Sequence, residues 1–334
     1  MKERDLTIDC LRFVGLSLII IAHVQAPYNL TQIRCFDVPM MLFISGLTSA
    51  GRSTGNYTEY IVKRTKRLIV PVWMFLFFYL SVFYFAQSIV LSEKYLTWDM
   101  IWRSFLLLDK SIGYVWIIRV FLLVMLVTPP LLWFTKNYSK IHHALGLATV
   151  LCGLLVLVNG IIDNIENEGL CMVLIRDIVQ YTVAYSIPFV LGLYIKGMGK
   201  RQELLFIVFL AILSIVPFYY YTQTNSFPEG LAEKYKFPPQ VYYITYGSLM
   251  SAALWSLRPI WKYVTKIKAI VFIGQNTIWI YLWHMPFALF ATVFMHNWII
   301  KYFLVYGMAI TCFGIQYLIV SRMSNKTITK YLIG

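Results

Sequence analysis

Residues 68–86 read Leu-Ile-Val-Pro-Val-Trp-Met-Phe-Leu-Phe-Phe-Tyr-Leu-Ser-Val-Phe-Tyr-Phe-Ala, without a single charged side chain. As a helix this stretch is about 28 Å long, close to the roughly 30 Å thickness of the hydrocarbon core of a bilayer. A helix satisfies its backbone hydrogen bonds internally, so it can carry such a run through lipid. The stretch therefore predicts a membrane-spanning helix.

Similar apolar blocks recur along the chain, among them residues 13–22, 120–134 and 204–216. Only 13% of the residues are charged and the mean hydropathy is +0.68, far from the average of soluble proteins. The sequence predicts an all-α integral membrane protein with about ten transmembrane helices, forming one domain over residues 1–334. The predicted spans are residues 7–26, 36–50, 67–90, 114–134, 143–161, 176–195, 203–222, 240–257, 268–291 and 299–320.

The formal net charge of +14 comes from 29 lysines and arginines that stand in short clusters between the apolar blocks. A nucleic-acid-binding protein gathers such residues in one polar domain, so this pattern argues against a nucleic-acid partner. With an even number of spans both chain ends lie on one side, and placing them in the cytoplasm puts most basic residues there. We therefore predict cytoplasmic termini and a first helix that is retained, since no cleavage pattern follows it.

The five cysteines lie far apart and mostly within apolar segments, at Cys10, Cys35, Cys152, Cys171 and Cys312. Their spacing fits neither a disulfide framework nor a metal site. We expect them to pack as small apolar side chains, and we expect no metal.

The first predicted span carries three ionisable side chains, Asp9, Arg12 and His23. Asp9 and Arg12 share a helical face near the cytoplasmic end, where an ion pair would reduce the cost of burying both. His23 lies eleven residues beyond Arg12, about 16 Å along the same stripe. Interfacial positions for the first two and a packing role for His23 are the alternatives, but the shared stripe favours a functional cavity.

Arg64 and Arg67 belong to a basic cluster directly before the third span. Positive charge at a cytoplasmic helix end accounts for such a cluster by itself. Two guanidinium groups on one face are also suited to a phosphorylated ligand that arrives from the cytoplasm. Both explanations stay open from the sequence.

Two further ionisable groups fall within predicted spans. Arg119 follows Trp116 in the fourth span, where snorkelling and a cavity role are both compatible with its position. His284 stands in the outer half of the ninth span, the same half as His23, and a hydrogen-bonded structural role is its alternative.

The second span is irregular, since Pro39, Ser45 and Gly46 interrupt its apolar run. Small residues in a transmembrane helix usually mark close packing, which is our first interpretation of Ser45 and Gly46. Asp37 at the outer end of this span can face water or a cavity.

Together these residues make the chain resemble the acyltransferase 3 family of polytopic membrane acyltransferases, especially short members that modify bacterial surface polysaccharides. The resemblance covers nearly the whole chain. Its most specific part is the family pattern of an arginine, ten residues and a histidine, present as Arg12 and His23. The other matching segments are residues 43–46 (Phe-Ile-Ser-Gly), Arg64 with Arg67, Trp116 with Arg119, and residues 281–284 (Tyr-Leu-Trp-His).

The resemblance implies transfer of an acyl group, most often acetyl, from cytoplasmic acyl-CoA to a sugar hydroxyl of a surface or lipid-linked polysaccharide. It also implies a multi-pass protein of the bacterial cytoplasmic membrane, surrounded by membrane lipids. Arg12, Arg64 and Arg67 would hold the phosphates of acetyl-CoA or another acyl-CoA. His23 would act as general base or as transient acyl carrier, with Asp9 orienting Arg12.

The same resemblance makes Asp37, Ser45, Trp116, Arg119 and His284 candidates for the substrate cavity. At Asp37 the chain departs from the family pattern. Related short members often carry a histidine in a Phe-His-Met-Pro stretch, whereas this chain has Phe36-Asp-Val-Pro39. The departure puts acceptor handling at Asp37 in question.

A transporter or flippase for a glycan or lipid intermediate is the alternative function, because charged residues along a path through the membrane would look similar. The sequence contains no recognisable inverted repeat, which argues against this alternative. A purely structural membrane partner is disfavoured by the ionisable stripe of the first span.

Overall fold

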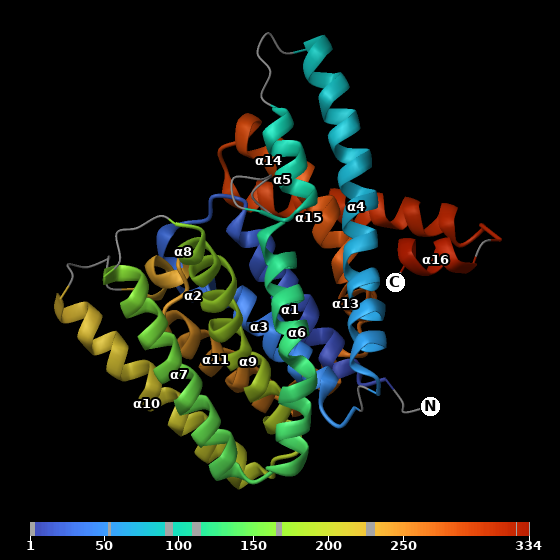
Figure 1. The fold of residues 1–334 in the computed structure, drawn as a ribbon. Helices are drawn as coiled ribbons and strands as arrows, with labels where there is room; N and C mark the ends of the chain where they lie inside the picture. Colours follow the sequence, from blue (N-terminus) through green and yellow to red (C-terminus); the bar gives the residue numbers. More distant parts are fainter. Residues whose placement is uncertain are drawn as a thin grey trace. The chain divides into compact units, whose positions relative to one another are not determined.

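The computed structural model describes residues 4–52, 55–90, 96–108, 115–164, 169–224, 231–324 and 326–333. All regular structure in these ranges is helical (Figure 1), which confirms the predicted all-α class. The helices are α1 (Leu6–Ala22), α2 (Tyr28–Arg34), α3 (Asp37–Ser49), α4 (Tyr57–Val90), α5 (Trp98–Phe105), α6 (Trp116–Asn137), α7 (Ile141–Asn164), α8 (Leu170–Leu174), the π-helical η1 (Ile175–Gln180), α9 (Tyr181–Ile195), α10 (Lys200–Thr224), the 3-10 helix η2 (Ala232–Lys236), α11 (Val241–Ser256), α12 (Arg258–Val264), α13 (Lys268–Gln275), α14 (Thr277–Phe294), α15 (Trp298–Val320) and α16 (Lys326–Ile333).

Seven helical segments in the described ranges are long and apolar enough to cross a membrane. They lie in α4, α6, α7, the run from α8 to α9, α10, α14 and α15. A chain with this many apolar helices of bilayer length is a polytopic membrane protein.

The other three predicted spans contain shorter helices, namely α1 with 17 residues, α3 with 13 and α11 with 16. Thirteen residues give a helix of about 20 Å, which is less than the hydrocarbon thickness. Most of the α3 side chains are buried within the protein, so packing and not lipid determines where this helix ends. Ten crossings and cytoplasmic termini therefore stay predictions.

The predicted span 268–291 is two helices and not one. α13 ends at Gln275 and α14 begins at Thr277, with Asn276 between them at φ −117° and ψ 27°, outside the helical region. The sequence at the interruption is Gly274-Gln-Asn276, and glycine and asparagine are both poor helix formers.

The chain divides into two compact units. The first unit comprises residues 1–54 and 126–275, and the second unit comprises residues 55–125 and 276–334. One boundary falls inside α6 and another separates α13 from α14. A single acyltransferase domain over the whole chain stays a prediction.

The core of the first unit is the contact between α3 and α9. Every residue of α9 except Thr182 is buried. A Cβ atom on Gly46 of α3 would overlap the carbonyl oxygen of Phe189, and one on Gly192 of α9 would overlap the carbonyl oxygen of Phe43. The two glycines thus let the backbones touch, which confirms the close packing predicted at Gly46.

Replacing either glycine should destabilise the first unit. We expect Gly46→Ala and Gly192→Ala each to lower the free energy of unfolding by about 1–3 kcal/mol, because the added methyl group meets backbone and not a movable side chain. Gly153→Ala in α7 is the matched control, since nothing lies within 4 Å of the Cβ it adds. Thermal unfolding of the purified proteins in detergent measures the effect, and equal stability of all three variants would contradict the packing.

Candidate functional site

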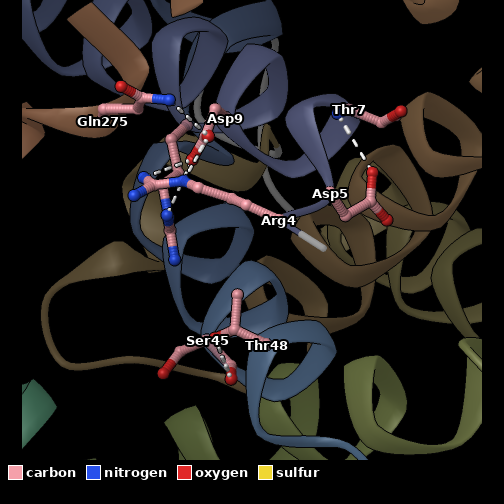
Figure 2. A network of polar contacts seen from close by, with 8 residues as sticks. Arg4, Asp5, Thr7, Asp9, Ser45, Thr48 and Gln275 are labelled. Atoms are coloured by element: carbon pink, nitrogen blue, oxygen red, sulfur yellow. Dashed lines mark hydrogen bonds and ion pairs between the residues drawn. The ribbon is translucent and has the colours of Figure 1, made fainter. Parts of the chain in front are cut away.

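The start of α1 is organised around the carboxylate of Asp9. This side chain is 1% exposed and accepts hydrogen bonds from Arg4 Nε at 2.7 Å, Arg4 Nη2 at 2.9 Å and Arg12 Nη1 at 2.9 Å. Gln275 Nε2 adds a longer contact at 3.4 Å, and Figure 2 shows how Arg4 and Gln275 converge on Asp9. The Asp9–Arg12 ion pair predicted from the sequence is confirmed.

Local structure and packing explain why these groups meet. Asp5 caps α1 by accepting a hydrogen bond from the backbone N–H of Thr7, so the helix begins at Leu6. Asp9 and Arg12 are therefore both helical and lie on one face, three residues apart. Gly274 of α13 lies so close to α1 that a Cβ there would overlap the Asp9 carbonyl oxygen. This backbone contact brings the neighbouring Gln275 to the carboxylate.

The geometry gives Asp9 an orienting role. One buried carboxylate is shared by two guanidinium groups, and the hydrogen bonds to it raise the pKa of Arg4 above its usual value. The side chain of Arg12 remains 27% exposed, so it can still meet an anionic group. Asp9 itself is enclosed and holds the arginines in place.

His23 lies at the opposite end of α1, as the C-cap residue of the helix. Its backbone N–H donates to the carbonyl of Ile20 at 3.0 Å, and its side chain is half-buried. The sequence predicted a helix to residue 26, but α1 ends at Ala22 and a turn leads to Pro27. A continuous helix therefore separates Arg12 from His23, as predicted, while His23 stands at its end and not within it.

Asp37 forms a second buried ion cluster in the first unit. Its carboxylate accepts from Arg34 Nη1 at 3.1 Å and from Lys236 Nζ at 2.8 and 3.1 Å, and Asp37 Oδ1 also accepts from the backbone of Val38. All three charged side chains are at most 7% exposed. The cluster ties α2, α3 and η2 together, so the carboxylate of Asp37 is already engaged within the protein.

Sequence reasoning missed Arg4 and Gln275 at Asp9 and both cations at Asp37. Arg34 precedes Asp37 by three residues, the same spacing that predicted the pair of Asp9 with Arg12. The same spacing rule could therefore have predicted the Arg34–Asp37 pair. Lys236 lies 199 residues from Asp37, and no spacing indicates that contact.

Ser45 in α3 is half-buried, and its carbonyl oxygen accepts a hydrogen bond from the hydroxyl of Thr48 at 2.9 Å (Figure 2). This bond is internal to the helix. A substrate contact of Ser45 stays a prediction.

The basic cluster of the second unit lies in the first turns of α4, which begins at Tyr57, ten residues before the predicted span. It lines a cavity of about 510 Å³. The lining residues are Thr58, Glu59, Val62, Lys63, Lys66, Arg67 and Tyr331. Arg64 is not among them, and its guanidinium stands over the ring of Tyr60, 5.5 Å from the centroid. The two predicted arginines therefore differ in what they contact.

The remaining predicted residues also belong to the second unit. Trp116 begins α6 and Arg119 follows one turn later, both half-buried. His284 in α14 is fully buried, and its Nδ1 contacts the carbonyl oxygen of Tyr281, consistent with the hydrogen-bonded structural alternative. Roles of these three side chains in a substrate cavity stay predictions.

Within the described ranges, no group of three or more histidine, cysteine, aspartate or glutamate side chains is arranged to hold a metal ion. The cations around the cavity at α4 in the second unit, and the partly exposed Arg12 in the first unit, are suited to a phosphorylated cofactor.

Removing the charge of Asp9 should destabilise the protein. We expect Asp9→Asn to lower the free energy of unfolding by about 1.5–3 kcal/mol, because three hydrogen bonds from charged donors lose their ionised acceptor. Asp99→Asn is the matched control, since the Asp99–Arg103 pair in α5 is exposed and should contribute about 0–1 kcal/mol. Denaturant unfolding in detergent compares the two variants, and an equal effect would refute the assignment.

The Asp37 cluster predicts an asymmetry between its members. Asp37→Asn should cost about 3–5 kcal/mol, because two buried cations lose their counter-ion. Lys236→Met should cost less, since a neutral Arg34–Asp37 pair remains, and the double variant should be less destabilised than the sum of both. Thermal unfolding of the four proteins tests this order; additive effects would show that the charges do not interact.

The chain matches a family model described as an acyltransferase domain over residues 5–318, which includes α1, the Asp9–Arg12 pair and the Asp37 cluster. Neither the curated proteins nor the solved structures give a significant match. Because the family model covers nearly the whole chain, this protein belongs to the acyltransferase 3 family.

Proposed function

We propose that the protein transfers an acyl group, in the simplest case acetyl, from cytoplasmic acyl-CoA to a sugar hydroxyl of a surface or lipid-linked polysaccharide. The observation that carries the proposal is α1, one continuous helix with the Asp9-oriented Arg12 near its start and His23 at its end. About 16 Å separate the two residues along the axis, so a cation for the donor and a base for the acceptor stand at different depths.

With cytoplasmic termini, the Arg12 end of α1 faces the compartment that holds acyl-CoA. Arg12, whose side chain is partly exposed, contributes its guanidinium for donor phosphates, and Arg64 and Arg67 are further cations with the same role. Asp9 acts through Arg12 and does not touch the reacting atoms. The protein then works in the bacterial cytoplasmic membrane as a multi-pass enzyme.

His23 is the proposed general base. Its imidazole accepts the proton of the sugar hydroxyl while that oxygen attacks the thioester carbonyl. Collapse of the tetrahedral intermediate breaks the carbon–sulfur bond, and the proton held by His23 passes to the departing CoA thiolate. The products are an O-acyl sugar and CoA. In the alternative route His23 itself carries the acyl group between donor and sugar.

The acceptor side of the proposal rests on Ser45, Trp116, Arg119 and His284, which we keep as candidates for contact with the glycan. Asp37 is not kept as a candidate for contact with the glycan, because Arg34 and Lys236 already bind its carboxylate. We therefore propose that Asp37 shapes the first unit and that the acceptor is held by other groups.

Substitution of His23 tests the proposal. Base-labile acetate on surface glycans is measured in cells that contain the intact protein, His23→Ala or neither, at matched membrane levels. We expect acetate only with the intact protein, because the variant lacks the base. His296→Ala is the matched control, an exposed histidine outside any helix, and should retain full acetylation.

The same cells discriminate between enzyme and transporter. If acetate is equal in all of them and the amount of exported glycan differs, the protein moves the glycan and the acyltransferase proposal is wrong. If acetylation depends on the protein but not on His23, the acyltransferase stands and the role of His23 is refuted.

A further inference from the structure

The short helix α12 (Arg258–Val264), which the sequence did not predict, lies between α11 and α13 in the first unit. None of its residues is buried. Trp261 holds the helix against its predecessor, because the Trp261 Nε1 donates a hydrogen bond to the carbonyl of Leu254 in α11 at 2.7 Å. α12 therefore rests on the end of α11 and keeps its surface outside the protein core.

The start of α12 lies at the end of a membrane-spanning helix. Arg258 Nη2 donates to Glu203 Oε2 at 2.5 Å, and Glu203 belongs to the first turn of α10. α10 is one of the helices long and apolar enough to cross a membrane, and its apolar run begins at Leu204. The ion pair thus places α12 where α10 enters the hydrocarbon, at the boundary between lipid and water.

α12 and the residues after it expose apolar and basic side chains next to each other. Ile260 is 56% and Tyr263 is 71% exposed, and their spacing of three residues places them on one face of the helix. Lys262 and Lys266 are also exposed, and Lys266 Nζ stands 5.5 Å from the centroid of the Tyr263 ring. The exposed Lys268 begins α13. These five residues are named the α12 surface below.

The α12 surface carries an excess of positive charge. Beyond Glu233 the sequence contains no aspartate or glutamate. Glu203 is engaged by Arg258, and among the residues that the structure describes no carboxylate forms an ion pair with Lys262, Lys266 or Lys268. An anion from outside the chain would complement these lysines.

We propose that the α12 surface binds the headgroups of anionic phospholipids at the membrane boundary. The three lysines contact the phosphates, while Ile260 and Tyr263 enter the region where headgroups meet acyl chains. The exposed apolar side chains favour a lipid over a soluble anion, because a soluble anion would leave both of them in water. The inference goes beyond the proposed function and does not depend on acyl transfer.

The position of α12 connects this surface to the rest of the first unit. α12 and α13 both pack against α1, and Gly274 of α13 touches the backbone of Asp9. The positive-inside rule accounts for lysines near a helix end, but it requires neither exposed apolar neighbours nor affinity for a particular lipid. A headgroup site requires both, which makes the two explanations distinguishable.

Titration of the purified full chain in neutral detergent tests the proposal. Phosphatidylglycerol and phosphatidylcholine are added separately, and the dissociation constant of each bound lipid is measured by native mass spectrometry. We expect the intact protein to bind phosphatidylglycerol at least about tenfold more tightly than phosphatidylcholine, because each basic residue near the surface contributes about fivefold. Lys262→Gln/Lys266→Gln should lose this preference.

Two control variants separate position from charge. Lys262→Arg/Lys266→Arg keeps the charge and should keep the preference for phosphatidylglycerol. Lys136→Gln/Lys140→Gln removes two exposed lysines from the connection between α6 and α7 and should bind both lipids as the intact protein does. Unfolding temperatures of all variants check that these exposed substitutions leave the fold intact.

A third variant tests the apolar half of the surface. Ile260→Ser/Tyr263→Ser should weaken the binding of both lipids several-fold, because the apolar contacts with the acyl region are lost while the lysines remain. Inorganic phosphate in excess should not displace phosphatidylglycerol from the intact protein.

The proposal is overturned if Lys262→Gln/Lys266→Gln still prefers phosphatidylglycerol, or if Lys136→Gln/Lys140→Gln loses the preference to the same extent. The first result would remove the lysines of α12 from the site, and the second would assign the preference to general positive charge. It is also overturned if inorganic phosphate displaces the lipid or if Ile260→Ser/Tyr263→Ser binds as tightly as the intact protein, since the surface would then hold a soluble anion.

Discussion

A carboxylate removed from water must be compensated by positive charge, and the first unit depends on this constraint at two places. Asp9 and Asp37 are each almost completely buried, and each is shared by two cations. One cation of each pair lies three residues away on the chain, and the other comes from outside the helix. The two clusters therefore link the beginnings of α1 and α3 to segments that the helices alone would not hold.

This use of charge separates enclosed groups from accessible ones. Asp9 is enclosed, whereas the side chain of its partner Arg12 stays partly accessible, so the carboxylate sets the orientation of a cation that can still meet a ligand. His23 stands at the other end of the same helix, outside both clusters. Asp37 also has both oxygens engaged, which agrees with the departure from the family pattern at this residue.

In the second unit the balance of charge is different. The basic residues at the start of α4 outnumber the one carboxylate beside them and surround a cavity. The wall supplied by Tyr331 depends on hydrogen bonds from α14 and α15 to the backbone of α16. Excess charge around a preset cavity is suited to an anionic ligand, while balanced charge in a closed cluster is suited to stability.

The sequence by itself determined the helical membrane class, the Asp9–Arg12 pair and the close packing at Gly46, because hydrophobic length and helical spacing are local properties. Only the tertiary structure decided that Lys236 neutralises Asp37, that Gly192 meets α3, and that the basic cluster of α4 lines a cavity together with Tyr331. These contacts join residues far apart in the chain, where the order of amino acids carries no spacing rule. The tertiary structure also showed that α1 ends before His23, because the chain turns at residues 23–25, where Gln25 has a φ of 55°, before it reaches Pro27.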